Sequence, residues 1–439
     1  MSPITDTVLA VELNYMTGFG NDFQSQALPD AIPIGQNSPQ KPKYGLYAEQ
    51  INGTSFLASR HENLRSWLYR IKPSVLSCDL IKADYPDFQT RPFRVNYTKP
   101  LPYRWDPLVT DLNKSVTFLD SIITIAGNGD LASVRGSAIH LYAFNQNMQN
   151  QFFHNADGDF LIVPYRGNLL INTEFGKIDL KPGEIALIPR GIKFNVNNLT
   201  DFCAGYILEN YGPHFRLPNL GPIGSNGLAN PRDFLTPVAS FEDKQETNQL
   251  IFKASGQFFK AEIEYSPLNV VAFHGNYVPY KYDLSMFQVI NTVSFDHCDP
   301  SIFTVLTSPS ELSAYSNVDF VIFPPRWLVS EHSFRPPYYH KNFMSEYMGL
   351  IKGTYEAKEE NFIPGGGTLH NQFTAHGPDS NAFNKASNED LTPKYLANTM
   401  AFMFESSLTY HLTQLASVTP KMHKNYLSCW ADLPKNFRT

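Results

Sequence analysis

Hydrophobic and polar residues alternate along much of this chain, in short runs separated by turn residues. The clearest stretch is 152–198, FFHNADGDFLIVPYRGNLLINTEFGKIDLKPGEIALIPRGIKFNVNN. Its turns, at Gly167, Gly176, Pro182-Gly183 and Gly191, recur at intervals of about eight to nine residues. This rhythm is typical of antiparallel strands in a β-barrel or sandwich.

Similar alternation predicts further strands on both sides of this stretch. We expect strands within residues 44–50, 65–71, 120–143, 270–284, 289–308, 319–327 and 401–412. The Pro-, Gln- and Asn-rich piece 29–43 is expected to be an extended arm, and 221–237 a long ordered loop. A short helix is expected after Asp379, with Thr392 as its N-cap and Pro393 as its first residue.

The composition supports a compact, β-rich protein. Aromatic residues make up 14% of the 439 residues and charged residues only 17%. A net charge of −6 without a basic run argues against nucleic acid as a partner. No apolar run approaches the roughly 20 residues that span a bilayer, so no membrane association is expected.

The cysteines and the first residues indicate the compartment. The start, MSPITDTVLAVELNY, lacks the basic region and apolar run of a signal peptide. The four cysteines lie far apart without a CxxC pair, which predicts free thiols in a reducing compartment. We therefore expect a cytoplasmic protein.

The stretch 334–379 carries the candidate chemistry, in the form of His340, Glu346, His370 and His376. His340 and Glu346 are six residues apart, so on one extended strand both side chains would share a face. The run of three glycines at 365–367 is expected to reverse the chain and return His370 and His376 to the same place. Two imidazoles and one carboxylate form the facial triad that suits non-haem Fe(II). The spacing leaves the third ligand open between His370 and His376.

Each of these residues has a simpler reading by itself, as a loop histidine or as a strand carboxylate paired with a lysine. Their convergence favours the metal site, because five of the twelve histidines lie between 297 and 376. A buried, unpaired carboxylate in so aromatic a stretch would also be costly without a cation. A zinc hydrolase site is the competing metal reading, but the helical HExxH pattern is absent.

Residues 152–198 resemble a cupin module, a small β-barrel that carries metal ligands on two short motifs. His154, Asp157 and Asp159 occupy the region of the first motif, whereas Phe194 stands where the second motif has histidine. We therefore expect a mostly β fold of two cupin-like barrel or sandwich halves with few short helices. Residues 1–285 would form a metal-free N-terminal domain with its arm, and residues 286–439 a C-terminal domain with the Fe(II) site.

A series of short motifs resembles the homogentisate 1,2-dioxygenase family from about residue 14 to residue 430. In chain order these motifs are GFGND, GLYAEQ, SWLYRI, NADGDFLIVP, TEFGK, GPIGSNGLANPRDF, FHGNYVPYKY, FDHCDPSIFTVLT, DFVIFPPRW, FRPPYYH, MSEYMGLIKG, PGGGTLH, HGPD and AFMFESS. Their number and order make a chance match very improbable.

The resemblance implies a mononuclear Fe(II) enzyme that opens the ring of homogentisate with O2. The product would be 4-maleylacetoacetate, in tyrosine and phenylalanine catabolism. It also implies hexamers built from trimers, which suits the N-terminal arm. On the matching positions it assigns His340, Glu346 and His376 to the metal, His297 to acid/base catalysis, and Tyr355, His370 and His376 to the substrate side.

Two other functions fit parts of the pattern. A related cupin dioxygenase could act on another hydroxylated aromatic, since specificity depends on the pocket walls and not on the ligands. A two-barrel storage protein would have degenerate metal positions in both halves, whereas the second half keeps His340, Glu346 and His376. Arg335 and Lys352 are candidates for the substrate carboxylate only because they lie nearby in sequence.

Overall fold

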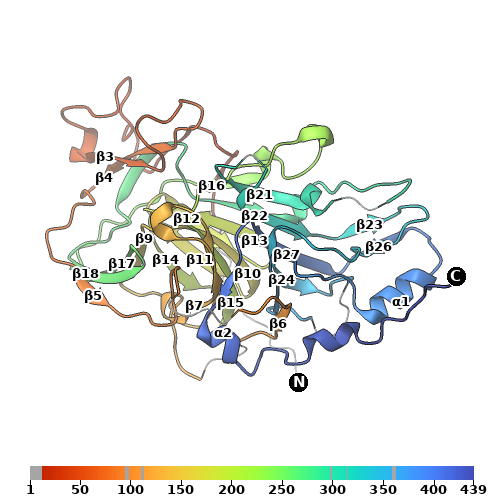
Figure 1. The fold of residues 1–439 in the computed structure, drawn as a ribbon. Coiled ribbons are helices and arrows are strands. Elements are labelled where there is room, and N and C mark those ends of the chain that lie inside the picture. Colours follow the sequence, from red (N-terminus) through yellow and green to blue (C-terminus); the bar gives the residue numbers. More distant parts are fainter. Residues whose placement is uncertain (1–11, 94–97, 110–112, 297–298, 313, 358–361) are drawn as a thin grey trace.

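The computed structural model describes residues 12–93, 98–109, 113–296, 299–312, 314–357 and 362–439. Strands dominate these residues, as the alternating pattern predicted (Figure 1). The α-helices of the described part are α1 (Ser380–Asn388) and α2 (Gln414–Val418). None of the described helices is long and apolar enough to cross a membrane.

The largest sheet has nine strands in the order β1-β16-β20-β13-β10-β15-β8-β7-β28. Its strands are β1 (Tyr15–Thr17), β7 (Ile123–Gly127), β8 (Ser137–Phe144), β10 (Asp159–Arg166), β13 (Glu184–Ile188), β15 (Cys203–Asn210), β16 (Phe234–Pro237), β20 (Tyr280–Asp283) and β28 (His411–Leu412). All neighbouring pairs in it are antiparallel.

A seven-stranded sheet, ordered β12-β11-β14-β9-β17-β18-β5, packs against the first. Its strands are β5 (Ile81–Ala83), β9 (Gln151–Asn155), β11 (Leu169–Thr173), β12 (Gly176–Leu180), β14 (Lys193–Asn198), β17 (Asn248–Ala254) and β18 (Gln257–Ile263). The turn glycines Gly167, Gly176, Gly183 and Gly191 all have positive φ, which confirms the predicted turns.

Two smaller sheets flank these. The four-stranded sheet, β2-β19-β4-β3, lies beside the long loops at the upper left of Figure 1. Its strands are β2 (Phe23–Gln26), β3 (Tyr47–Asn52), β4 (Arg65–Arg70) and β19 (Val270–Gly275). The two-stranded sheet pairs β23 (Arg326–Leu328) with β26 (Lys394–Leu396). Residues 27–46 form no strand, as expected for the arm.

The six-stranded sheet of the C-terminal half is ordered β21-β22-β27-β24-β25-β6. Its strands are β6 (Tyr103–Trp105), β21 (Thr304–Pro309), β22 (Ser316–Phe323), β24 (Ser345–Gly353), β25 (Gly367–His370) and β27 (Thr399–Ser406). β6 comes from the N-terminal half, and β28 of the nine-stranded sheet comes from the end of the chain. Each half therefore completes a sheet of the other.

The two halves also share one hydrophobic core. Tyr206, on β15, donates a hydrogen bond to the carbonyl oxygen of Gly366 (2.8 Å) and packs edge-on against Phe402 of β27, with ring centroids 4.8 Å apart. This contact places the inner face of the six-stranded sheet at a fixed position against the nine-stranded sheet.

The predicted helix start at Thr392 and Pro393 is wrong. Helix α1 begins earlier, and its N-cap is Asp379, whose carboxylate accepts a hydrogen bond from the backbone N–H of Ala382 (2.8 Å). Pro393 instead directly precedes β26, consistent with the preference of a proline for the beginning of an edge strand.

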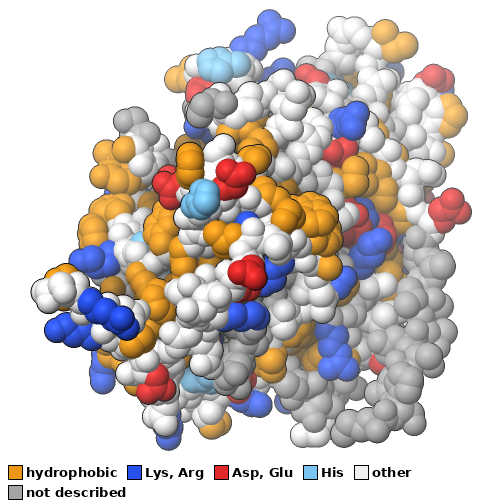
Figure 2. Space-filling view, turned by 90° about the vertical axis from the view of Figure 1, so that its right-hand side faces the viewer, with side chains coloured by type: hydrophobic (Ala, Val, Ile, Leu, Met, Phe, Trp, Pro, Cys, Tyr) orange, Lys and Arg blue, Asp and Glu red, His pale blue; other side chains and the backbone are white. Residues whose placement is uncertain are grey.

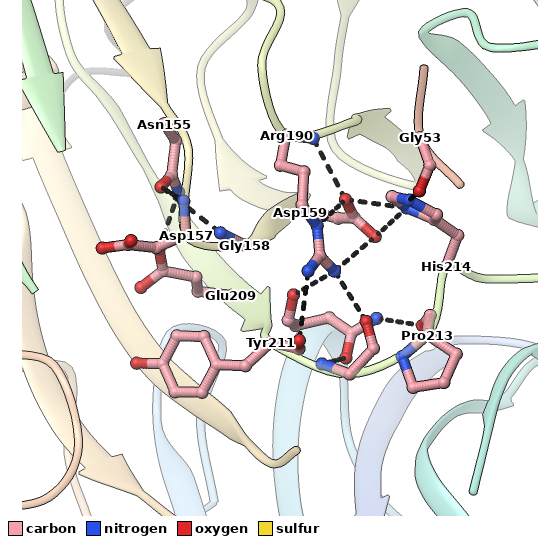
Figure 3. Close-up of polar contacts among 12 residues, drawn as sticks. Gly53, Asn155, Asp157, Gly158, Asp159, Arg190, Glu209, Tyr211, Pro213 and His214 are labelled. Atoms are coloured by element: carbon pink, nitrogen blue, oxygen red, sulfur yellow. Dashed lines mark hydrogen bonds and ion pairs between the residues drawn. The ribbon is translucent and has the colours of Figure 1, made fainter. Parts of the chain in front are cut away.

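A buried ionic cluster ties the β3–β4 connection to the nine-stranded sheet (Figure 3). Asp159 accepts hydrogen bonds from Arg190 Nε (3.0 Å) and His214 Nδ1 (2.9 Å). His214 Nε2 in turn donates to the carbonyl oxygen of Gly53 (2.7 Å). Burial opposes ionisation, but Arg190 and His214 outweigh it and hold the pKa of Asp159 well below its usual range.

Candidate metal centre

Register across the six-stranded sheet brings three polar side chains to one face. Glu346 on β24 lies directly opposite His370 on β25 and opposite Glu405 on β27. Residues that are directly opposite each other in a sheet project from the same side. All three side chains line one cavity.

His340 and His376 line the same cavity but lie outside the strands of the sheet. They form an isolated antiparallel bridge, in which each backbone N–H donates to the other residue's carbonyl oxygen (3.0 and 3.1 Å). The expectation that His340 and Glu346 share one strand is wrong, because β24 begins at Ser345. Between them the side chain of Asn342 accepts the N–H of Met344 (3.0 Å) and forms a turn.

His340, Glu346 and His376 converge, and each offers one ligand atom within 4.8 Å of the others. Glu346 Oε2 lies 2.9 Å from His376 Nε2, and Glu346 Oε1 lies 3.7 Å from His340 Nε2. Of the two candidates for the third position, His376 therefore joins this group.

Backbone carbonyl oxygens accept hydrogen bonds from the Nδ1 atoms of His340 and His376. His340 Nδ1 donates to the carbonyl oxygen of Tyr338, and His376 Nδ1 donates to that of Thr374, both at 2.8 Å. In a neutral imidazole held this way, Nε2 carries the lone pair that a metal needs. With a metal bound, both Nε2 lone pairs and the Glu346 carboxylate would face it, so a cation between them fits this donor set. Without the metal, Nε2 instead carries a proton and donates it to Glu346.

The electrostatics of the site follow from burial and from these contacts. Burial would raise the pKa of Glu346, but hydrogen bonds from His340 and His376 hold it well below its usual range. The hydrogen bond to Glu346 raises the pKa of His340. Burial and the charge of Glu346 raise the pKa of Glu405 to about 8.

The cavity beside these residues has a volume of about 420 Å³, within the usual range for a small-molecule site. One side carries polar groups, and the other walls are largely aromatic and apolar. The apolar and aromatic lining residues are Phe323, Tyr338, Met348, Tyr355, Phe362 and Met403. A small, flat aromatic molecule with a few polar substituents fits this lining.

His370 and Tyr355, which the resemblance places on the substrate side, both line this cavity. The ring of His370 stacks on that of His376, with centroids 4.0 Å apart and planes 5° apart. His370 Nε2 lies 3.5 Å from the hydroxyl of Tyr426. Tyr355 is buried.

The structure gives different outcomes for the other three candidates. His297 is outside the described residues. Arg335 is buried, and its guanidinium donates to backbone carbonyl oxygens, including that of Leu328 (3.2 Å). Lys352 is exposed, and neither it nor Arg335 lines the cavity.

Sequence reasoning missed Asn342 and Glu405, which both line the cavity. Asn342 Nδ2 donates to Glu346 Oε1 (2.9 Å) and to Glu405 Oε1 (2.7 Å). One signal was available for Glu405, which is the only acidic residue in the apolar run AFMFESS. Asn342 had none, because its role depends on a loop conformation.

The N-terminal half repeats the same strand arrangement with different side chains. The run β13-β10-β15-β8 mirrors β25-β24-β27-β22. Phe160 lies opposite Glu209, as Glu346 lies opposite Glu405, and Phe153 pairs with Phe194, as His340 pairs with His376.

The three phenylalanines pack together, with ring centroids 5.7–6.3 Å apart. They offer no ligand atoms at the positions of the triad. Glu209 is instead paired with the ammonium of Lys253 (2.8 Å).

Comparisons with known proteins agree with this geometry. The family model described as homogentisate 1,2-dioxygenase N-terminal matches residues 14–284, and the corresponding C-terminal model matches residues 285–437. A homogentisate 1,2-dioxygenase from Sinorhizobium medicae is 54% identical over 427 residues, which cover 96% of this chain and 94% of the relative. One from Caenorhabditis elegans is 54% identical over 430 residues, covering 97% and 98%.

Among solved structures, a cupin 2 conserved barrel domain protein from Leptotrichia buccalis is similar, with a TM-score of 0.27 and 10% identity. The match covers 70% of this chain and 93% of that protein. The family assignment rests on the sequence relatives and on the two family models, which together span nearly the whole chain. The chain belongs to the homogentisate 1,2-dioxygenase family.

Proposed function

We propose that this protein is an Fe(II)-dependent dioxygenase that opens the ring of homogentisate with O2 to give 4-maleylacetoacetate. The reaction belongs to tyrosine and phenylalanine catabolism. The observation that carries the proposal is the convergence of His340, Glu346 and His376 beside an aromatic cavity, in a chain of this family.

The donor set supports iron. His340, Glu346 and His376 would hold the metal through two imidazole nitrogens and a carboxylate, the 2-His-1-carboxylate set of non-haem Fe(II) oxygenases. When bound, Fe(II) would let electron density pass from the substrate ring to triplet O2, which does not react directly with a closed-shell aromatic ring; the electrons come from the substrate. The carbonyl oxygens of Tyr338 and Thr374 keep both imidazoles in the tautomer that presents Nε2.

The protein groups around the cavity would bind and orient the substrate. Tyr355 and His370 face the same space as the triad, and the apolar walls exclude water from the ring. We assign the proton transfers to His297, since an imidazole with a pKa near 6.5 can accept a phenolic proton and later return one. This role rests on the family resemblance of FDHCDP.

We also propose that the protein is a cytoplasmic homo-hexamer, a dimer of trimers. The described cysteines Cys78, Cys203 and Cys429 are free thiols, consistent with a reducing compartment. Large hydrophobic side chains are exposed on the described surface. They include Trp327 on β23 and Tyr395 on β26. Hydrophobic side chains also gather in several places on the face shown in Figure 2. Exposed apolar groups of this kind support subunit contacts.

Anaerobic reconstitution with Fe(II), followed by O2 uptake, tests the activity. We expect uptake with homogentisate to exceed that with gentisate or 3-hydroxyanthranilate. A higher rate with either competitor would contradict the substrate assignment. Glu346→Ala should abolish iron retention, whereas Glu262→Ala, an exposed glutamate on β18, should keep it. Near-stoichiometric iron in Glu346→Ala would contradict the metal site.

A further inference from the structure

Three hydrogen bonds hold the side chain of Asn342 in one orientation, and a fourth holds its backbone. Its Nδ2 donates to Glu346 and Glu405, and its Oδ1 accepts the N–H of Met344 (3.0 Å). Its backbone carbonyl oxygen accepts the N–H of Phe373 (2.6 Å). Exchanging Oδ1 and Nδ2 would set an oxygen against two carboxylates and an NH2 group against an N–H. The amide therefore has one satisfactory orientation.

The two oxygens of Glu346 consequently have different partners. Oε2 faces His376 Nε2 at 2.9 Å. Oε1 accepts the hydrogen bond from Asn342 (2.9 Å) and lies farther, 3.7 Å, from His340 Nε2. The amide thus binds the oxygen that faces His340, and leaves Oε2 with His376 as its hydrogen-bond partner.

Glu405 anchors the amide from the other side. An amide NH2 group has two hydrogens, and here each carboxylate takes one. Among the described residues no lysine or arginine pairs with Glu405, whereas Glu209 at the matching position of the N-terminal half pairs with Lys253 (2.8 Å). The partly buried Glu405 therefore serves as a hydrogen-bond acceptor within the site and not as half of an ion pair.

We propose that Asn342, anchored by Glu405, is a positioning residue that reserves Oε1 of Glu346, so that the carboxylate presents only Oε2 to the metal. The inference rests on the proposed function. A carboxylate that binds through both oxygens takes one more position of an octahedral metal. Limiting Glu346 to one oxygen keeps three positions free for the substrate and O2 together.

The wild-type protein loaded with Fe(II) provides the direct test, by anaerobic crystallography or X-ray absorption. We expect one Glu346 oxygen bound to iron and the other within hydrogen-bonding distance of Asn342. Two bound Glu346 oxygens would overturn the inference while leaving the metal site intact. Wild-type protein that binds no iron at this site would overturn the proposed metal site, and this inference with it.

The variant Asn342→Ala should let Glu346 bind iron through both oxygens. We expect stoichiometric iron and a 10–100-fold loss of turnover, the usual effect of removing a group that orients a ligand. Unchanged one-oxygen coordination in this variant would overturn the inference. Asn388→Ala, which removes an exposed amide in α1, is the matched control and should change neither coordination nor turnover.

The anchor is tested separately by two changes at Glu405. Glu405→Gln keeps a carbonyl oxygen that can accept from Asn342, and should keep one-oxygen coordination. Glu405→Leu removes the acceptor and should behave like Asn342→Ala. Equal coordination in the two Glu405 variants would overturn the anchoring role, and this comparison does not depend on the folding of Asn342→Ala.

Discussion

Glu346 and Glu405 lie directly opposite each other on β24 and β27, and both are largely buried. The amide of Asn342 is hydrogen-bonded to both carboxylates. Two carboxylates this close together repel each other when both are ionised. Glu346 stays ionised, so the ionised form of Glu405 is the one that is disfavoured. Its burial and the charge of Glu346 explain why the pKa of Glu405 rises to about 8.

This relationship predicts how the stability of the metal-free protein depends on pH. Between pH 4.5, the ordinary value, and about 8, folded Glu405 binds more protons than the unfolded chain does. The free energy of unfolding should therefore fall as pH rises through this window, by up to a few kcal/mol. Glu405→Gln should flatten this dependence in denaturant titrations of chelator-treated protein, while Glu262→Gln should not. Parallel curves for wild type and Glu405→Gln would contradict the prediction.

Iron retention should distinguish His376 from His370, although their rings stack on each other. His376→Ala removes a nitrogen that faces Glu346 and should lose iron during dialysis against a chelator. His370→Ala should retain it, because His370 Nε2 faces Tyr426. Metal analysis of the two proteins side by side is the measurement, and equal iron loss would make His370 a ligand as well.

Catalysis should depend on His297 without any effect on the metal. His297→Phe is expected to keep its iron and fold but to lose turnover by at least about a hundredfold, the typical contribution of a positioned acid or base. The exposed His61 provides the control change His61→Phe. Full activity in iron-loaded His297→Phe would exclude the acid/base role, and loss of iron would make His297 a ligand.

The stability of the N-terminal half should depend on Lys253. Its ammonium is fully buried and pairs with Asp157 (2.9 Å) and Glu209 (2.8 Å). Lys253→Met leaves these buried carboxylates without a cation, and we expect a loss of roughly 3–5 kcal/mol in the free energy of unfolding. The control is Lys260→Met, an exposed lysine on the adjacent β18.

Low pH should also destabilise the N-terminal half, through protonation of Glu209 beside Lys253. Burial opposes ionisation of Glu209, but Lys253 and His140 lower its pKa to about 2. Its stabilising contribution is therefore complete above the ordinary value of about 4.5 and is lost as the pH falls toward 2. Equal stability of wild type and Lys253→Met at neutral pH would contradict this account.

The sequence was most informative where the physical signal is local. Alternation and turn glycines such as Gly167 and Gly183 predicted the strands, because both follow from backbone geometry. The residue types at 340, 346 and 376 indicated a triad. The expectation that His340 and Glu346 share one strand was wrong. His340 precedes β24 and is connected to it by a turn that Asn342 forms.

Long-range pairing was beyond the reach of these patterns. Glu405 faces Glu346 only because β27 lies beside β24, and β6 joins β25 from far along the chain. Likewise, Arg335 is close to the triad in sequence, but its guanidinium binds backbone carbonyl oxygens outside the cavity. Proximity in sequence does not determine which way a side chain points.

The exchange of β6 and β28 between the halves has a consequence for how this protein is made. As the nascent chain leaves the ribosome, β6 emerges long before its partner β25, and β7 emerges long before its partner β28. Until then both strands expose unpaired edges that invite association with other chains. Neither strand can therefore pair with its partner until synthesis has passed β25 (Gly367–His370), and the incomplete polypeptide is the species most in need of a chaperone.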